Sequence, residues 1–441
     1  MYPNSCKEQS TPFNFYIIMK KFFLFLFTSL TFLAGISSCS DDSVYNKEDY
    51  TTQTLFVYMP WTGSDNNSGL YPYFLVNIDS MEAGVKANSG LNHKRLLIYL
   101  NTSATAAKLF EVTFNGNACT ETTLKEYTGK NYLSASGMAG IFSDAFQAAP
   151  ALNYAMIIGC HGNGWTFKDD WTDYPSYAKS SIGTSPYASN QLANKNKNGH
   201  PTRFFGSVDD IKDYSVDIPT LSEALTTAEN EMTYPSGSNH KLQYLLFDDC
   251  YMANVETAYE LRNVTNFLIG STSEIMAEGM PYYSMWNNLS SASPSYSNLT
   301  SSFYNYYSKY SMPYGTISVT DCRQMDNLAT FMKTINSKYT LVDSLRDSVQ
   351  VLDGFGTPIF YDMTSYVDHL GLKKSDLNSY AALISKVVVS AKATSKLYSA
   401  LGLGITYRDI KVFSGLTISD LSQNSVALKG KEKTSWWSAT H

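Results

Sequence analysis

The fold is decided by two short apolar runs and by the residues that follow each of them. Tyr154-Ala-Met-Ile-Ile158 leads into Gly159-Cys-His-Gly-Asn-Gly-Trp165, and Tyr244-Leu-Leu-Phe247 leads into Asp248-Asp-Cys250. Continuous apolar runs of this length are typical of central parallel strands, which are covered on both faces. The sequence therefore predicts two neighbouring buried strands, each ending in polar and reactive side chains.

The same kind of run recurs along the chain and alternates with helical patterns. Three further strands are predicted at 54–59, 95–100 and 267–270, and helices at 70–88, 133–149, 219–230 and 252–262. Strands separated by helices form right-handed βαβ units, so we predict an α/β fold with an open, mostly parallel sheet flanked by helices. Residues 106–127 alternate between apolar and polar residues and predict an antiparallel excursion.

The rest of the chain predicts a second, mixed part and a long loop. After residue 296 we expect helices at 297–310, 322–347 and 376–395 and strands at 315–319, 358–361 and 412–418. These patterns divide the chain into an α/β domain over 53–320 and a C-terminal helical and mixed subdomain over 321–441. Residues 166–203 are rich in Ser, Asn, Lys and Gly and lack apolar periodicity, which predicts a long exposed loop.

Composition and missing motifs exclude several classes of protein. The 441 residues are 44% apolar, so the chain can bury a large core, and its net charge of −6 argues against general nucleic-acid binding. Six Cys are too sparse for a disulfide scaffold, and no two of the six His have the spacing of a zinc site. The chain has no G-x-G-x-x-G, P-loop, G-x-S-x-G or H-E-x-x-H motif.

The N-terminus predicts export. Met19-Lys-Lys21 precedes an apolar run over 22–36, which is typical of a signal peptide and too short for a comfortable membrane span. We interpret Met19 as the true start of the protein and residues 1–18 as an extension added in error upstream of it. Ile36-Ser-Ser-Cys39 resembles a bacterial lipobox, so we predict removal of 1–38, lipidation of Cys39 and a tether over 39–52. The predicted location is the outer membrane or cell surface; the alternative is an ordinary signal peptide with a chance Cys.

The ends of the two central strands suggest thiolate chemistry. Catalytic residues gather at the carboxyl ends of parallel strands, and there His161 and Cys250 project from neighbouring strands. A His can take the proton of a Cys thiol and return it to a leaving amine. The predicted helix over 252–262 would add its N-terminal dipole to stabilise the thiolate. The backbone amides of Gly162 and Cys250 are candidates for an oxyanion hole.

The residues also permit a plainer interpretation. A buried Cys is usually a small apolar side chain, and a His in a Gly-rich turn is often structural. Cys160 stands beside His161, but strand alternation points neighbours to opposite faces, so Cys160 is a weak candidate for the nucleophile.

Two motifs resemble those of a known family. Cys160-His-Gly-Asn-Gly-Trp165 resembles the His-Gly-x-Gly-Trp motif of clostripain-like cysteine peptidases, and residues 247–262 resemble their Asp-Ala-Cys-Leu-Met motif and its helix. The similarity extends from about residue 54 to the C-terminus. It implies a caspase-like fold and a Cys–His dyad that acts through a thioester acyl-enzyme, with Cys250 as the nucleophile and His161 as the base.

The resemblance also implies cleavage after Arg or Lys. The family's Asp two positions before the nucleophile corresponds to Asp248, whereas Asp249 stands where the family usually has Ala. Glu274 and Glu278 follow the next predicted strand and are further candidates for a pocket that accepts a basic side chain. Each of these four acids could equally be a solvated loop charge. The chemistry requires no cofactor or metal; some relatives use calcium, but the chain lacks an EF-hand-like run of ligands, so calcium stays open.

Several relatives are activated by cleavage between the two motifs. In this chain that interval contains Lys168, Lys179, Lys195, Lys197 and Arg203, which suggests self-cleavage within 168–203. The alternative is a passive surface insertion. A second hypothesis for the whole protein is a non-catalytic surface lipoprotein that binds peptide or glycan through its many Tyr and Trp, although the intact Cys and His motifs argue against it.

Overall fold

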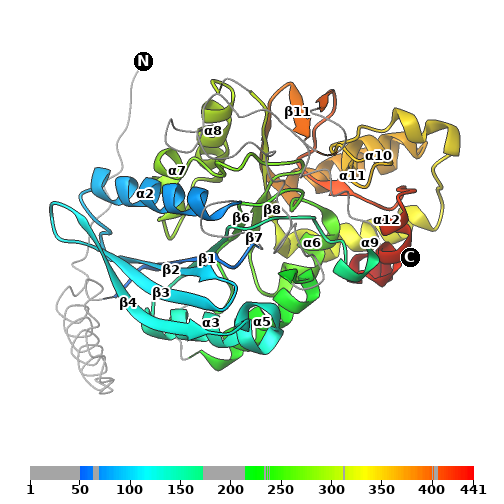
Figure 1. The fold of residues 1–441 in the computed structure, drawn as a ribbon. Coiled ribbons are helices and arrows are strands. Elements are labelled where there is room, and N and C mark those ends of the chain that lie inside the picture. The colour runs from blue at the N-terminus through cyan, green and yellow to red at the C-terminus, as the bar shows by residue number, and fades with distance from the viewer. Residues whose placement is uncertain are drawn as a thin grey trace, which may run out of the picture. The chain divides into compact units, whose positions relative to one another are not determined.

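A nine-stranded sheet forms the centre of the chain (Figure 1). The computed structural model describes residues 50–62, 69–171, 214–232, 239–310, 313–399 and 406–441, together with Pro235, Gly237 and Leu401. The strand order is β10-β8-β7-β6-β5-β1-β2-β3-β4. The strands are β1 (Gln53–Met59), β2 (Lys94–Ser103), β3 (Ala106–Phe114), β4 (Cys119–Thr128), β5 (Tyr154–Ile158), β6 (Leu245–Phe247), β7 (Phe267–Gly270), β8 (Thr316–Asp321) and β10 (Val388–Ala393).

The predicted fold class is confirmed. Strands β2, β1, β5, β6 and β7 pair in parallel, whereas β3 and β4 at one side and β8 and β10 at the other pair antiparallel. The pair β3–β4 is the predicted antiparallel excursion. Every residue of β1, β5, β6 and β7 is buried, which explains why these strands are continuous apolar runs.

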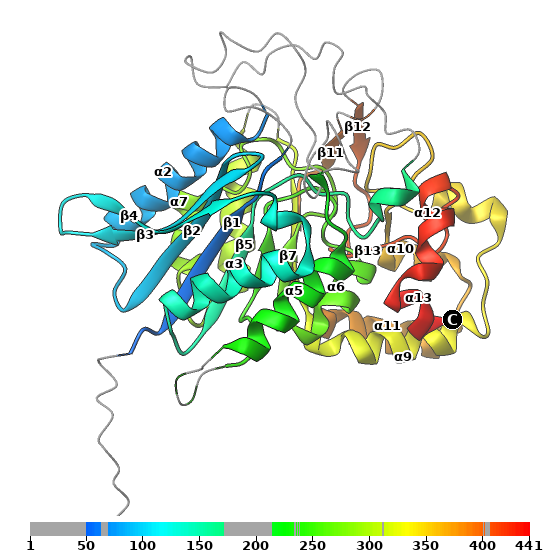
Figure 2. The same ribbon diagram turned by 60° about the horizontal axis from the view of Figure 1, so that its bottom comes forward.

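Helices cover both faces of the sheet. Helices α2 (Tyr71–Ala87), α7 (Tyr282–Leu289) and α8 (Tyr296–Tyr307) lie on one face, and α3 (Ala135–Ala148) and α5 (Ile218–Glu231) lie on the other (Figure 2). Alternate residues of β1 take part in the two cores: Val57 packs with the α2 side, and Phe56 and Tyr58 pack with Phe142 of α3. The sheet is therefore a middle layer between two apolar cores.

The residues after 321 surround a third core and also complete the main sheet. This part contains α9 (Met325–Asn336), β9 (Tyr361–Asp362), α10 (Met363–His369), α11 (Lys374–Val387), β11 (Lys396–Ser399), β12 (Thr406–Asp409), β13 (Thr417–Ile418), α12 (Ser425–Gly430) and α13 (Ser435–Thr440). Their core includes Trp436 and, from the earlier part of the chain, Val255 and Tyr259. Strand β10 pairs with β8 at the edge of the main sheet. Residues 50–441 cluster as one unit.

Several predicted boundaries in this part are wrong. The helix predicted over 322–347 ends at Asn336, where Ser337 and the β-branched Thr340 and Val342 follow. The second half of the helix predicted over 376–395 is strand β10, because the edge of β8 offers pairing to a segment that begins with two Val residues. The strands predicted at 358–361 and 412–418 reduce to the two-residue strands β9 and β13, which pair with each other.

The predicted exposed loop begins later than residue 166. Thr166, Asp170 and Trp171 are buried, and the Trp171 indole N–H donates to Thr166 Oγ1 at 3.2 Å. Residues 172–213 lie outside the described residues, and so do Lys179, Lys195, Lys197 and Arg203. The predicted signal peptide, Cys39 and most of the tether fall within 1–49, also outside the described part. Among the helices that the structure describes, none is long and apolar enough to cross a membrane.

Candidate active site

The two predicted catalytic residues lie at the same level of the sheet edge. Strands β5 and β6 pair in parallel with Ile158 opposite Phe247, as the sequence predicts for these neighbours. His161 and Cys250 each follow this paired position by three residues. Because the chains continue side by side, with Asp248 N donating to Ile158 O at 2.8 Å, the two loops leave the sheet together. We call them the His161 loop (residues 159–165) and the Cys250 loop (residues 248–254).

Gly162 brings the two loops into backbone contact. A Cβ atom built at Gly162 would lie 2.6 Å from Asp249 Cβ and 2.8 Å from Cys250 N, and closer still to the carbonyl oxygen of Cys250. No side chain fits between these backbones, so only glycine permits this approach. His161 and Cys250 themselves are 1% and 0% exposed. The residues predicted as base, nucleophile and oxyanion-hole amides are thus gathered in one place.

Asp249 links the Cys250 loop to the His161 loop through a hydrogen bond to Cys160. Its Oδ1 accepts the backbone N–H of Cys160 at 2.7 Å, and its Oδ2 lies 3.4 Å from Cys160 Sγ. Cys160 packs in the core on the α3 side, whereas Cys250 belongs to the core on the α2 side. The structure therefore places the Cys160 thiol on the opposite face from Cys250, as the alternation predicts. It also gives Asp249, which stands where the family usually has Ala, a role as a bridge.

Tyr251 reverses the chain directly after Cys250. Its φ of 61° lies in the left-handed region, which is uncommon for a residue with a large side chain. The Tyr251 ring stacks on Phe360 at 4.9 Å between centroids, and its hydroxyl donates to Glu274 Oε1 at 2.7 Å. These contacts hold the turn in place.

This turn overturns the prediction that a helix begins beside Cys250. Helix α6 (Val255–Glu260) begins only after Asn254, whose Oδ1 accepts the N–H of Thr257 at 2.7 Å, and it is six residues long. The influence of a helix N-terminus fades within the first turn, so α6 does not stabilise a thiolate at Cys250. A main-chain donor is present instead: Ile275 N lies 3.2 Å from Cys250 Sγ. The Cys250 thiol in turn lies 3.7 Å from Ile275 O, to which it can donate.

The acidic candidates are held by tyrosines and a serine. Asp248 accepts from the hydroxyl of Tyr282 at 2.8 Å, Glu274 accepts from Tyr251 and from Ser399, and Glu278 accepts from Tyr310 at 3.0 Å. Asp248, Asp249 and Glu274 are buried, so the alternative of solvated loop charges is wrong for these three.

Glu274 lies near the candidate nucleophile, because the next residue, Ile275, contacts Cys250 Sγ through its N–H. Burial raises the pKa of the Tyr398 hydroxyl, and the nearby charges of Glu274, Cys250 and Glu278 raise it further. Tyr398 on β11 thus has all three of these groups among its electrostatic neighbours. Within the described residues, no three His, Cys, Asp or Glu side chains are grouped so that they could hold a metal ion.

Sequence reasoning missed the contacts that support the site. The Asp249–Cys160 bridge had a usable signal, because both residues follow the paired position of β5 and β6 by two. No local pattern pointed to Ile275 at the sulfur or to the positive φ of Tyr251, since both depend on segments that meet only in the folded chain.

The fold and this site together define a cysteine peptidase of the caspase-like α/β class. The model of the clostripain family matches residues 192–416. A secreted cysteine protease of Bacteroides thetaiotaomicron called iotapain is 38% identical to this chain, with a TM-score of 0.74. The match covers 89% of this chain and 99% of the iotapain chain. The chain belongs to the clostripain family of cysteine peptidases, and the predicted resemblance is confirmed.

Two more distant structures share the fold. An inactive zymogen protease of Parabacteroides distasonis is 22% identical with a TM-score of 0.69. A secreted cysteine protease of Bacteroides thetaiotaomicron, solved with an irreversible peptide inhibitor, is 20% identical with a TM-score of 0.67. Both matches cover 89% of this chain and 99% of the other. No curated protein matches the chain.

Proposed function

We propose that this cysteine endopeptidase cleaves after Arg or Lys through a Cys250–His161 dyad. His161 accepts the thiol proton, and the Cys250 sulfur attacks the scissile carbonyl carbon. The amides of Gly162 and Cys250 donate to the oxyanion that forms. The intermediate expels the amine, which takes its proton from His161, and leaves a thioester that water hydrolyses. One observation carries this proposal: Gly162 packs against the Cys250 backbone where two paired strands end.

The dyad is tested by single substitutions in the purified enzyme. Cys250→Ala should abolish turnover of a basic peptide substrate, and His161→Ala should do nearly the same, while both proteins keep the wild-type circular dichroism. Cys160→Ala is the matched cysteine control: it keeps the main-chain bond from Cys160 to Asp249 and should keep most of the activity. A Cys250→Ala variant with a tenth of wild-type turnover would show that the nucleophile is another residue.

The preference for Arg or Lys is proposed to rest on the acids that follow strands β6 and β7. A cation taken out of water needs an opposite charge, and Asp248, Glu274 and Glu278 supply three candidates. Asp248 remains the principal one because it lies two residues before the nucleophile. Glu274 is the second, because the next residue, Ile275, contacts the sulfur through its N–H.

We also propose that the enzyme cuts its own chain. The backbone N–H of Lys168 donates to Asp217 at 2.8 Å, and its Nζ donates to Ser215 O at 3.3 Å. Because these bonds hold Lys168 in the folded structure, we remove it from the candidate cleavage sites. Lys179, Lys195, Lys197 and Arg203 are thus the preferred sites. The flanking strands β5 and β6 are fully buried and paired, so the two products would stay associated.

The same proposal covers export, anchoring and cofactors. The signal peptide and Cys39 would place the enzyme on a membrane, at the outer membrane or cell surface, and the secreted relative supports export. Dyad chemistry needs no metal, so addition of a chelator should leave kcat unchanged; stimulation by calcium would instead reveal a metal requirement.

The alternative function, a non-catalytic protein that binds peptide or glycan, is tested with a thiol-reactive lysyl or arginyl peptide. This probe labels Cys250 only if the protein is a peptidase.

A further inference from the structure

The end of the chain contacts both catalytic loops. From the His161 loop, the Trp165 indole N–H donates to Ser419 Oγ at 2.8 Å. From the Cys250 loop, Ala253 O accepts the N–H of Thr417 at 3.0 Å. Ser419 then donates its own N–H to Glu256 Oε1 at 2.8 Å, at the start of the helix that follows Cys250. One residue, Ser419, thus links Trp165 to Glu256.

The same segment also contacts the chain just beyond the His161 loop, at Asp170. Lys433 Nζ pairs with Asp170 Oδ1 at 2.6 Å, and Lys429 Nζ donates to Asp170 O at 3.3 Å. Helix α13 also packs against α6, as Figure 2 shows. Contacts from one segment to two loops fix the position of each loop relative to the other.

We propose that residues 415–441 form a clasp that holds the His161 loop and the Cys250 loop in register, with Glu256 as the residue that positions Ser419 against Trp165. The clasp touches no reacting atom; it acts through the two loops that carry the base and the nucleophile. The proposal rests on the proposed Cys250–His161 dyad for its effect on catalysis, but not for its effect on stability.

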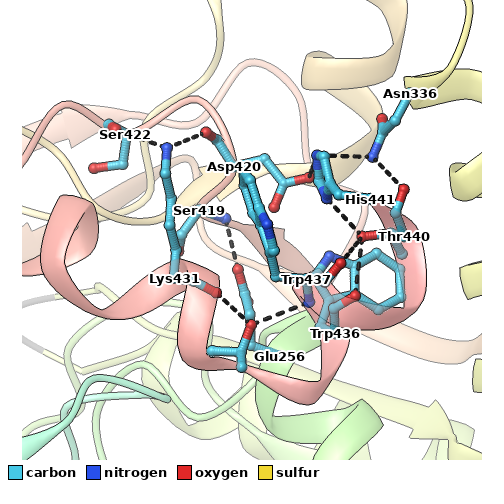
Figure 3. Close-up of polar contacts among 11 residues, drawn as sticks. Glu256, Asn336, Ser419, Asp420, Ser422, Lys431, Trp436, Trp437, Thr440 and His441 are labelled. Carbon is cyan, nitrogen blue, oxygen red and sulfur yellow. Dashed lines mark hydrogen bonds and ion pairs between the residues drawn. The ribbon is translucent and has the colours of Figure 1, made fainter.

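The surroundings of Glu256 make the clasp sensitive to protonation (Figure 3). Glu256 is buried, and Asp420, the residue after Ser419, lies in the same cluster with its side chain 5% exposed. Lys431 faces both acids, and its Nζ donates to the carbonyl oxygens of Asp420 at 2.6 Å and Ser422 at 3.4 Å. The other charged or titratable groups around the cluster are His441, whose Nε2 lies 4.0 Å from Asp420 Oδ2, together with Tyr366, Arg346 and Glu432.

Burial disfavours the charged forms of both Glu256 and Asp420. It raises the pKa of Glu256 to about 8, and the charge of Asp420 contributes to that rise. Burial likewise raises the pKa of Asp420 to about 7, against the opposing effect of Lys431. At neutral pH Glu256 therefore keeps its proton. As the pH rises through about 8, a second anion forms beside Asp420 in a buried place, and the clasp loosens.

The direction in which stability changes with pH follows from the linkage between proton binding and folding. Glu256 has a folded pKa above its ordinary value of 4.5, so its contribution to stability is complete below that value and is lost as the pH rises through about 8. Loss of the clasp separates the loops, so kcat should fall over the same range while KM changes less.

The test uses the fully processed enzyme with a lysyl or arginyl peptide substrate, assayed from mildly acidic to alkaline pH. Wild type should lose kcat with an apparent pKa of about 8, and Glu256→Gln, which cannot ionise, should move this alkaline limb upward by at least about half a pH unit. Ser419→Ala removes the acceptor of Trp165 together with the hydroxyl that also hydrogen-bonds to Glu256, and it should lower kcat roughly three- to tenfold at neutral pH. An unchanged alkaline limb in Glu256→Gln, or an unchanged kcat in Ser419→Ala, overturns the proposal.

Glu229→Gln is the matched control. Burial raises the pKa of Glu229 on α5 to about 9, but this residue lies on the α3 side of the sheet, away from both loops. The control should alter the pH dependence of the melting temperature and leave the pH profile of kcat as it is.

Melting curves in the Cys250→Ala background separate failure of the clasp from failure of the dyad. In that background the pH dependence of stability should still differ between the chain that keeps Glu256 and the chain that carries Glu256→Gln. Should Glu256→Gln fail to fold, Ser419→Ala alone decides.

Discussion

The contact between Gly162 and the Cys250 backbone makes a quantitative prediction for Gly162→Ala. The new Cβ would lie 2.6 Å from Asp249 Cβ and 2.8 Å from Cys250 N, whereas an ordinary contact is at least 3.4 Å. Both neighbours belong to a buried loop whose backbone cannot rotate aside, so the loops must separate by about 1 Å. A misplacement of about 1 Å at reacting groups costs about a hundredfold in rate. Overpacking of a close-packed interior should also cost about 1–3 kcal/mol of unfolding free energy.

Gly140→Ala is the matched control for this substitution. Gly140 lies exposed in the middle of α3, where a new Cβ meets no atom within 4 Å. Ala favours the helix, so the control should gain about 0.5–1 kcal/mol of stability and keep wild-type kcat/KM. The assay pairs kcat/KM on a short basic peptide with denaturant unfolding in the Cys250→Ala background, which prevents self-cleavage. A Gly162→Ala enzyme within threefold of wild type would refute the inference that the two loops meet backbone to backbone.

Three further predictions concern specificity, activation and anchoring. Asp248→Asn should lower kcat/KM for basic substrates more than a hundredfold, about 3–5 kcal/mol, and spare neutral ones; equal losses would make Asp248 structural, with Glu274 and Glu278 as the leading pocket candidates. Incubated wild type should yield two associated fragments cut within 172–203 and Cys250→Ala a single band on a denaturing gel; a wild-type chain that is intact yet fully active contradicts self-activation. Cys39→Ser should move the protein from the membrane to the soluble fraction, and continued membrane association would exclude lipidation at this residue.

The central strands and the order of the motifs could be predicted from the sequence, because they depend on local patterns. A buried parallel strand must be apolar on both faces, so β1, β5 and β6 are visible as continuous runs. Parallel strands present their carboxyl ends at one edge, so the order of strands and motifs was enough to place His161 and Cys250 together. The same local logic put the Cys160 side chain on the opposite face.

Strand β10 at the edge of the sheet and the start of the helix after Cys250 depend instead on contacts with residues far away in the sequence. Val388 and its neighbours form β10 only because β8 offers an edge to pair with, and this pairing outweighs the helical pattern of the preceding residues. The helix after Cys250 was predicted too early because the turn at Tyr251 is held by Phe360 and Glu274, which are far away in the sequence.

The sequence by itself determined the α/β class, the order of the central strands' motifs and the candidate pair His161 and Cys250. The tertiary structure alone decided how that pair is supported: Asp249 bridges to Cys160, Ile275 donates to the sulfur, and Ser419 links Trp165 to Glu256 from near the end of the chain. Periodicity encodes which face of an element is buried, and therefore survives in the sequence. A hydrogen bond between residues hundreds of positions apart leaves no such period, because it forms only when folding brings the two segments together.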